Sequence, residues 1–287
     1  MPTNIATTIA DARRAVAEAR QRGLSVGLVP TMGALHAGHL SLIRAARQEN
    51  GFVVVSIFVN PTQFGPSEDL ARYPRPFAED VDKCRAESVD LIFHPDAAEM
   101  YPDGHVTFVE VHSLQEVLCG ASRPGHFRGV ATVVLQLFNI VQPDAAYFGQ
   151  KDAQQARIIA RMIRDLHVPV RLRVMPIVRE SDGLALSSRN QYLDAEQRKN
   201  AVALSRALQE ARRRVEQGER TAAVLVKLLT ERIAATPGAV LDYAAVVDEA
   251  TLQPLTRLAG KVLMALAVRY GATRLIDNTV LEIRSDS

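Results

Sequence analysis

Three short segments of the chain combine residue types that bind phosphate. His36-Ala37-Gly38-His39 carries two imidazoles, Gly149-Gln150-Lys151-Asp152 carries an ammonium group, and Leu186-Ser187-Ser188-Arg189-Asn190 carries two hydroxyls and a guanidinium. Lys and Arg neutralise phosphate oxygens, and preorganised N–H donors stabilise the charge that develops on a leaving group. The three segments together predict chemistry on a nucleoside triphosphate, although each alone has a plainer explanation.

The two histidines follow a predicted strand directly and lie at the start of a predicted helix. A helix N-terminus presents free N–H groups and the positive end of a dipole, which suit phosphate. Residues three positions apart lie on the same side of a helical turn. An exposed helix start or a packed polar pair explains the same residues equally well. Zinc is less favoured, because no third ligand is near and the Glu of the helical zinc-protease motif is absent.

Lys151 also follows a predicted strand and begins a helix. If the two strand–helix units are neighbours, their carboxyl ends face one crevice, because parallel sheets bind ligands at such a switch point. Taken alone, Lys151 is better explained as a solvated loop residue, and Ser187 and Ser188 as a helix-capping run. No dinucleotide fingerprint, Walker loop or nucleophile-elbow serine is present, so those three classes of site are not supported.

Strand-like and helical patterns alternate along the first 180 residues, which favours βαβ units and an α/β fold with a doubly wound, mostly parallel, Rossmann-like sheet. We expect strands at 24–30, 52–59, 89–93, 107–111, 145–148 and 170–178. We expect helices at 10–21, 38–48, 77–87, 129–141 and 152–166, the last capped by Asp152.

The alternation of strand-like and helical patterns ends near residues 182–190. Two long helices are expected at 194–217 and 221–235, and strands at 241–247, 261–270 and 274–283. The sequence therefore predicts a Rossmann-like domain over 1–180 and a smaller C-terminal α+β domain over 181–287, which begins with the Ser-Ser-Arg loop.

Composition narrows the class of protein. The 287 residues are 47% hydrophobic, and 34 basic and 32 acidic residues give a net charge of +2. A charge this close to neutral does not indicate nonspecific binding of nucleic acid. Cys84 and Cys119 lack metal-ligand spacing and form no disulfide framework, so we expect a cytoplasmic protein with inert thiols. There is no secretory signal pattern and no apolar stretch of the roughly 20 residues that span a membrane.

The three segments resemble the nucleotide site of the class I adenylating superfamily. Residues 36–39 are similar to its HIGH signature, and 186–189 take the place of its KMSKS-like loop. Longer stretches then resemble the pantothenate synthetase family in the same order, strongly over about 24–200 and more weakly beyond. They are Val29–His39, Phe58–Phe64, Tyr73–Arg75, Arg123–Val130, Phe148–Asp152, Ser187–Asn190 and Tyr192–Leu193.

This resemblance implies a ligase with small-molecule substrates and two reaction steps. Pantoate attacks the α-phosphate of MgATP, which gives pantoyl-adenylate and pyrophosphate. The amine of β-alanine then attacks the activated acyl carbon, which gives pantothenate and AMP. The family is typically homodimeric, and its magnesium is held mainly by the ATP phosphates, so no protein metal ligand is expected. Asp80 is a candidate outer contact of that ion.

The resemblance also implies roles residue by residue. His39 is the acid-type catalytic histidine with His36 as its partner, Gln63 contacts pantoate and β-alanine, and Gln155 contacts pantoate. Lys151, Ser187, Ser188 and Arg189 neutralise phosphate charge. The implied ATP contacts are Met32, Gly33, Ala34, Leu35, His36, Ala37, Gly38, His39, Gly149, Gln150, Lys151, Asp152, Val178, Leu186, Ser187, Ser188 and Arg189.

Two positions depart from the family pattern, since Leu186 replaces Met and Gln150 replaces Glu. Both leave Lys151 in place, and the first conserves volume and apolar character. Two other hypotheses are a nucleotidyltransferase that stops after joining a nucleotide to a phosphorylated acceptor, and a noncatalytic nucleotide-binding regulator. Gln63 and Gln155 count against the first because amides suit an uncharged hydroxy-acid site. The complete His, Lys, Ser and Arg set counts against the second.

Overall fold

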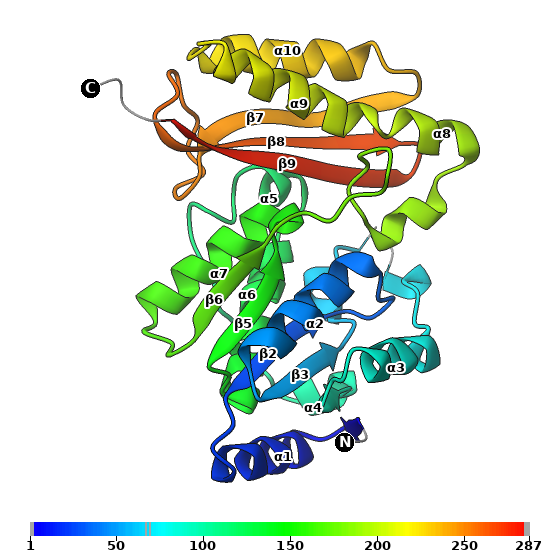
Figure 1. The fold of residues 1–287 in the computed structure, drawn as a ribbon, viewed down its shortest axis with the longest axis vertical. Helices are drawn as coiled ribbons and strands as arrows, with labels where there is room; N and C mark the ends of the chain where they lie inside the picture. Colours follow the sequence, from blue (N-terminus) through cyan, green and yellow to red (C-terminus); the bar gives the residue numbers. More distant parts are fainter. Residues whose placement is uncertain (1–2, 67, 69, 284–287) are drawn as a thin grey trace. The chain divides into compact units, whose positions relative to one another are not determined.

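The computed structural model describes residues 3–66, 68 and 70–283. They form two compact units, which are described separately below and can be followed in Figure 1. Unit 1 contains the described residues up to Glu116, together with Gly120–Gly149 and Ile158–Pro176. Unit 2 contains Val117–Cys119, Gln150–Arg157 and the described residues from Ile177 onward.

Unit 1 is built on a six-stranded parallel sheet with the order β1-β4-β3-β2-β5-β6. Its strands are β1 (Asn4–Ala6), β2 (Val26–Thr31), β3 (Phe52–Ile57), β4 (Leu91–Phe93), β5 (Ala145–Gly149) and β6 (Arg171–Met175). In β2, the neighbours Leu28 and Val29 are both fully buried. Successive side chains point to opposite faces of a strand, so both faces of the sheet are covered. The α/β fold expected from the sequence is confirmed.

The order of the strands reverses between β2 and β5. These two strands pair directly, with Gly27 beside Ala145, while the chain continues from β2 to β3 on one side and from β5 to β6 on the other. The carboxyl ends at such a reversal are where open α/β sheets bind ligands. The segment after β2 contains the histidine pair, and the segment after β5 begins at Gln150.

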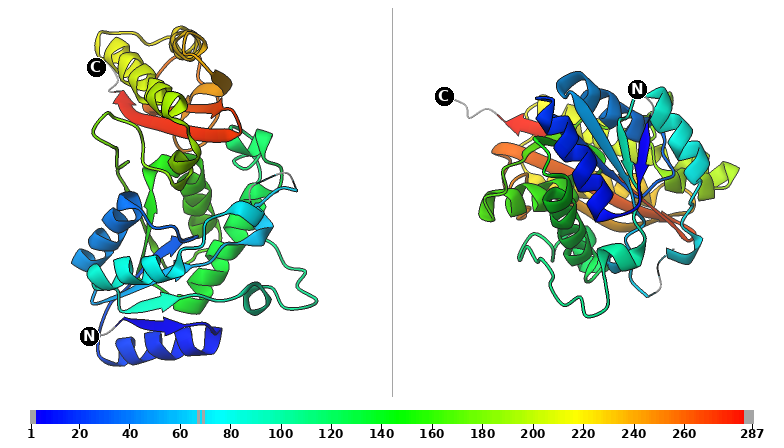
Figure 2. Two further views of the ribbon diagram at one scale, coloured as in Figure 1. Left: turned by 90° about the vertical axis from the view of Figure 1, so that its right-hand side faces the viewer. Right: turned by 90° about the horizontal axis from the view of Figure 1, so that it is seen from below.

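Helices flank the sheet, as the two views of Figure 2 show. They are α1 (Ile9–Gln21), α2 (Ala37–Glu49), α3 (Phe77–Ala86), α4 (Ala97–Met100), α5 (Cys119–Ser122), α6 (His126–Val141) and α7 (Ala153–Asp165). The helix α2 buries Leu42 and Ile43 in one apolar cluster with Val81 of α3 and Val55 of β3. Leu42, Ala45 and Ala46 are buried at a spacing of three and four residues, which places them on the side of α2 that faces the sheet. The helices α1 and α6 contact each other and also β2.

Unit 2 contains an antiparallel sheet with the order β7-β8-β9. The strands are β7 (Ala239–Asp248), β8 (Gly260–Tyr270) and β9 (Thr273–Ile283), and the helices include α8 (Ala195–Asn200), α9 (Ala203–Glu216) and α10 (Ala222–Ala234). Leu208 of α9, Leu229 of α10 and Leu266 of β8 share one buried cluster. The smaller α+β architecture expected at the C-terminal end is therefore confirmed.

Two local predictions were wrong. Residues 107–111 are not a strand, and β1 takes the outer edge of β4 instead, with Asn4 paired to Leu91. A strand of three residues is too short to show a periodicity. The single helix expected at 194–217 is divided into α8 and α9 at Ala201 and Val202, which are buried in the core of unit 2. Asp152 ends the 3₁₀ helix η3 (Gln150–Asp152) and directly precedes α7, the helix that the sequence predicted it to cap.

Across the part of the chain that the structure describes, no helix is both long enough and apolar enough to span a lipid bilayer.

Candidate active site

The loop after β2 is held by a buried carboxylate. Asp80 of α3 is only 1% exposed, and its Oδ2 and Oδ1 accept hydrogen bonds from the backbone N–H groups of Ala34 at 2.8 Å and Leu35 at 2.7 Å. Lys83 Nζ donates to the Leu35 carbonyl at 2.9 Å. Burial raises the pKa of Asp80, against the opposing effect of the two backbone hydrogen bonds. Asp80 thus fixes the backbone of the loop that leads into the histidine pair. The sequence had suggested a different role for it, as an outer contact of magnesium.

The histidine pair forms a reciprocal cap at the start of α2. His36 Nδ1 accepts the backbone N–H of Gly38 at 3.1 Å, and His39 Nδ1 accepts the backbone N–H of His36 at 3.3 Å. The ring centroids are 4.1 Å apart. A nitrogen that accepts a hydrogen bond carries no proton, so the proton of each neutral ring is on Nε2. Both rings therefore carry an Nε2–H group at a helix N-terminus, where negative charge is favoured.

Gly38 has a specific steric reason to be glycine. A Cβ atom at this position would lie 2.9 Å from Cε1 and 3.0 Å from Nδ1 of His36. Heavy atoms rarely come that close, so a side chain here displaces the ring that caps the helix. The group that approaches Gly38 closely is the imidazole of His36.

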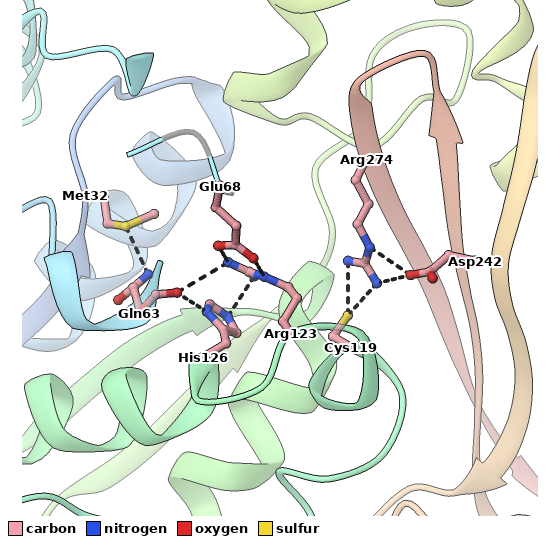
Figure 3. Close-up of polar contacts among 8 residues, drawn as sticks. All are labelled: Met32, Gln63, Glu68, Cys119, Arg123, His126, Asp242 and Arg274. Carbon is pink, nitrogen blue, oxygen red and sulfur yellow. Dashed lines mark hydrogen bonds and ion pairs between the residues drawn. The ribbon is translucent and has the colours of Figure 1, made fainter. Parts of the chain in front are cut away.

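Gln63 ends the 3₁₀ helix η1 (Pro61–Gln63), a few residues after β3, and is 8% exposed. Its Nε2 donates to Sδ of Met32 at 3.1 Å, and its Oε1 accepts from Nδ2 of Asn60 at 3.1 Å. Figure 3 shows the contact between Gln63 and Met32. A thioether is a weak acceptor, so this amide N–H can be transferred to a ligand oxygen at little cost. The structure thus brings together two residues that the sequence assigned to substrate and ATP.

Asn60 is a residue to which the sequence assigned no role. It is 1% exposed, its Nδ2 also donates to the Gly129 carbonyl at 3.1 Å, and its Oδ1 accepts from the hydroxyls of Thr62 at 2.9 Å and Tyr101 at 2.8 Å. Because it also holds the amide oxygen of Gln63, Asn60 fixes which end of that amide faces outward. An Asn-Pro pair directly after a strand is typical of a turn, and this is the sequence signal that could have drawn attention to Asn60.

In unit 2 the turn that carries Lys151 is held from a distant strand. Asn278 of β9 is 3% exposed, and its Nδ2 donates to the carbonyls of Gln150 at 3.0 Å and Lys151 at 2.9 Å. Its Oδ1 accepts from Nε2 of Gln150 at 3.0 Å. Lys151 Nζ lies 4.0 Å from Oδ1 of Asp152. Nothing in the local pattern around Asn278 indicated this role, because its partners are 127 and 128 residues away.

The Ser-Ser-Arg loop follows a small hairpin in unit 2. The backbone N–H of Leu186 donates to the Val178 carbonyl at 3.0 Å, so these two predicted ATP contacts are directly paired. Ser187 Oγ accepts the backbone N–H of Arg189 at 3.2 Å, which caps the 3₁₀ helix η4 (Ser188–Tyr192). The hairpin is tied to β9, because Asp277 accepts from Nη1 and Nη2 of Arg179 at 2.7 and 2.9 Å.

Gln155 lies in the first turn of α7 and is partly buried. Its neighbour Gln154 is occupied elsewhere, because Nε2 donates to the Val117 carbonyl at 2.7 Å and Oε1 accepts the backbone N–H of Cys119 at 2.9 Å. The Cys119 thiol lies 3.4 Å from both terminal nitrogens of Arg274, as Figure 3 shows. Burial raises the pKa of the Cys84 thiol to about 12, which keeps it protonated and unreactive.

The predicted site residues divide between the two units. Unit 1 contains 32–39, Gln63 and Gly149, and unit 2 contains 150–152, Gln155, Val178 and 186–189. Within residues 3–66, 68 and 70–283, no group of three or more His, Cys, Asp or Glu side chains is arranged to hold a metal ion.

Comparisons with known proteins agree with one another over nearly the whole chain. The family described as pantoate-beta-alanine ligase matches residues 4–280. The pantothenate synthetase of Moorella thermoacetica is 60% identical over 276 residues, which cover 96% of this chain and 98% of that protein. The corresponding protein of Heliobacterium modesticaldum is 57% identical, with 93% and 95% covered.

Solved structures give the same result. The crystal structure of pantothenate synthetase from Thermus thermophilus is similar with a TM-score of 0.92 at 47% identity, and covers 96% of this chain and 99% of that one. The pantoate-beta-alanine ligase of Francisella tularensis, complexed with beta-gamma ATP and beta-alanine, has a TM-score of 0.78 at 34% identity. There, 97% of each chain is covered.

Proposed function

Because the chain belongs to the pantoate–β-alanine ligase family, we propose that it condenses pantoate with β-alanine at the expense of ATP. The products are pantothenate, AMP and pyrophosphate, and the intermediate is pantoyl-adenylate. The observation that carries the proposal is the reciprocal histidine cap after β2, which places the proton of both neutral rings on Nε2 at a helix N-terminus. Such donors suit the charge that appears on departing pyrophosphate, and they need no reorganisation as it forms.

In the first step a carboxylate oxygen of pantoate attacks the α-phosphorus, and the bond from that phosphorus to the bridging oxygen of pyrophosphate breaks. We assign acid-type stabilisation of the leaving group to His39 and His36, and neutralisation of phosphate charge to Lys151, Ser187, Ser188 and Arg189. The remaining ATP contacts of the proposal are 32–35, Ala37, Gly38, Gly149, Gln150, Asp152, Val178 and Leu186. Magnesium bound to the ATP phosphates withdraws charge from them when present.

In the second step the amine nitrogen of β-alanine attacks the acyl carbon, the bond from that carbon to the AMP oxygen breaks, and the nitrogen loses a proton to solvent. Gln63 binds pantoate and lies beside the path of β-alanine, and Gln155 is the second pantoate contact. The amides orient hydroxyls and a carboxylate without adding charge. The hydrogen bond from Asn60 supports this assignment for Gln63, because it directs the Nε2–H donors toward a ligand.

Three further features belong to the proposal. The domain boundary lies near residue 180, the protein is cytoplasmic, and it forms a homodimer.

Val106 is 83% exposed and is followed two positions later by Phe108, a second exposed large apolar side chain, in a segment without regular secondary structure. Such apolar exposure favours a protein contact, and a second copy of this chain is the proposed occupant. Sedimentation would give the mass of the assembly, and Val106→Lys is expected to shift it toward the monomer.

Product analysis tests the proposed reaction. Purified protein with MgATP, pantoate and β-alanine is expected to form pantothenate, AMP and pyrophosphate in equal amounts, and a panel of related hydroxy acids measures its selectivity. A nucleotidyltransferase forms pyrophosphate but releases no AMP when an amine is added. A noncatalytic regulator binds ATP and forms none of the products, so either pattern would replace the proposal.

A further inference from the structure

The backbone carbonyl of Gln63 is held by two residues of the segment that leads into α6. His126 Nδ1 lies 2.8 Å from this oxygen, and Nη2 of Arg123 lies 3.5 Å from it. The two side chains also contact each other, with 2.9 Å between Nη1 of Arg123 and Nε2 of His126. Figure 3 shows this cluster with Glu68, which accepts from Nε and Nη2 of Arg123 at 2.6 Å each.

The chemistry of these groups fixes the protonation state of His126. A guanidinium has donors only, so Nε2 of His126 must accept the hydrogen bond from Arg123 and carry no proton. The proton of the neutral ring is then on Nδ1, which donates to the carbonyl of Gln63. The bidentate ion pair with Glu68 holds the guanidinium plane in place, since Arg and a carboxylate match in geometry.

The packing of α6 makes this contact close. A Cβ atom on Gly129 would lie 2.4 Å from the Thr62 carbonyl oxygen and 2.7 Å from Cα of Gln63. The first turn of α6 therefore lies directly against η1, where both Gly129 and the His126 ring reach the backbone of Gln63. A small displacement of His126 is consequently transmitted to the peptide that carries the Gln63 side chain.

We propose that Arg123 and His126 are positioning residues for Gln63, with Glu68 as the support of Arg123, and that they set the affinity of the site for its hydroxy-acid substrate. This inference rests on the proposed function, in which the Gln63 amide contacts pantoate. Asn60 holds the amide from the side-chain end, and His126 holds the same residue from its carbonyl. With only one of these attachments the peptide can rotate, and the amide donor loses its direction.

The test compares two substitutions of one residue. His126→Leu removes the donor to the Gln63 carbonyl, whereas the amide nitrogen of His126→Asn can take the place of Nδ1. We expect His126→Leu to raise KM for pantoate about tenfold, equivalent to ~1.4 kcal/mol and to the loss of about one hydrogen bond. KM for ATP and kcat at saturating pantoate are expected to stay within about threefold, and His126→Asn to recover most of the affinity.

A purely structural role predicts a different pattern. Equal changes in KM for pantoate and ATP, an unchanged KM in His126→Leu, or a His126→Asn variant as impaired as His126→Leu would each overturn the proposal. If His126→Leu does not fold, Arg123→Lys gives the same test, because an ammonium cannot hold Glu68 bidentately and also reach His126. Arg123→Lys is expected to raise KM for pantoate alone, and an unchanged value would overturn the proposal.

Failure of the inference is distinct from failure of the proposed function. A wild-type protein that forms no pantothenate contradicts the proposed function. A wild-type protein that forms pantothenate, together with His126 and Arg123 variants that keep its KM for pantoate, contradicts this inference alone.

Discussion

Two segments of this protein that we propose to bind phosphate are held in contrasting ways. The loop after β2 is held mainly by nearby residues, since His36 and His39 cap each other and Asp80 and Lys83 fix the backbone before them within 48 positions along the chain. The turn after β5 depends on Asn278, which lies 127 positions from Lys151. The first segment is thus largely specified by its own sequence, and the second by the C-terminal sheet.

Because of this difference, substitutions at the two segments are expected to affect the reaction in different ways. Changes near the histidine pair alter groups proposed to face the leaving pyrophosphate. Changes at Asn278 alter the Lys151 turn from the opposite end of the sequence, without removing any group that contacts substrate. Variants at both segments can therefore test whether the two are held independently.

The largest effect is expected for His39→Ala. Loss of one preorganised donor to developing charge typically lowers the rate by about 10²–10³. Pyrophosphate exchange should fall by that factor, while KM for pantoate changes little. His112→Ala is the matched control, because the His112 side chain is 75% exposed. Equal rates of pyrophosphate exchange for His39→Ala and His112→Ala would show that the histidine cap does not contribute to catalysis.

A smaller effect, about tenfold in kcat/KM for ATP, is expected for Asn278→Ala. Two carbonyls of the Lys151 turn lose their donor, and a buried acceptor without a partner costs about 1–3 kcal/mol of stability. Asn278 and Lys151 act as a unit in this account, so Lys151→Ala should add little when combined with Asn278→Ala. Additive losses would show that Asn278 acts elsewhere. Asn200→Ala, which removes one exposed hydrogen bond to the Pro237 carbonyl, is the control.

Asp80→Asn is expected to reduce activity by a few-fold and stability by about 1–3 kcal/mol. One acceptor oxygen becomes an NH₂ group that faces a backbone N–H of Ala34 or Leu35. Urea unfolding and KM for ATP measure the two effects. Asp82→Asn on the same helix is the control, because its side chain is 75% exposed. If both variants unfold at the same urea concentration, the loop does not depend on Asp80.

The smallest effect concerns pH and Glu68. Burial is the largest single effect and acts to raise the pKa of Glu68. The hydrogen bonds and the charge of Arg123, together with smaller contributions from the Gly65 backbone and His126, outweigh burial and leave the pKa below its usual value. Between the folded and unfolded pKa the native state binds fewer protons, so the ion pair stabilises the protein above the unfolded pKa of about 4.3. This stabilisation is lost as the pH falls through the folded pKa. The Tm difference between wild type and Glu68→Gln should therefore be full above about pH 5 and shrink on acidification.

Glu216→Gln is the control for this titration, because Glu216 forms an exposed ion pair with Arg212 one helical turn away. A Tm difference for Glu68→Gln that grows as the pH falls would contradict the sign derived above.

The sequence predicted most of the sheet because buried parallel strands are short apolar runs and amphipathic helices repeat with a period of 3.6 residues. It did not predict β1, whose three residues show no period, or the break at Ala201 and Val202, where core packing overrides the helical pattern. The histidine pair was predictable from its position at a helix start.

The supports of the candidate site were less predictable. Asn60 and Asn278 are single buried amides, and what they do depends on partners that only the folded chain brings near. The positions of Arg123 and His126 were visible as part of a family motif, yet their hydrogen bonds to Gln63 were not. Local patterns report the period of an element, and they do not report which distant backbone group a side chain will bind.

The central claim is that the chain activates a carboxylate as an adenylate before any amine takes part. The most direct measurement is exchange of labelled pyrophosphate into ATP by the wild-type protein with magnesium. The account predicts exchange that requires pantoate and proceeds without β-alanine. No exchange, exchange without pantoate, or exchange only after β-alanine is added would contradict it.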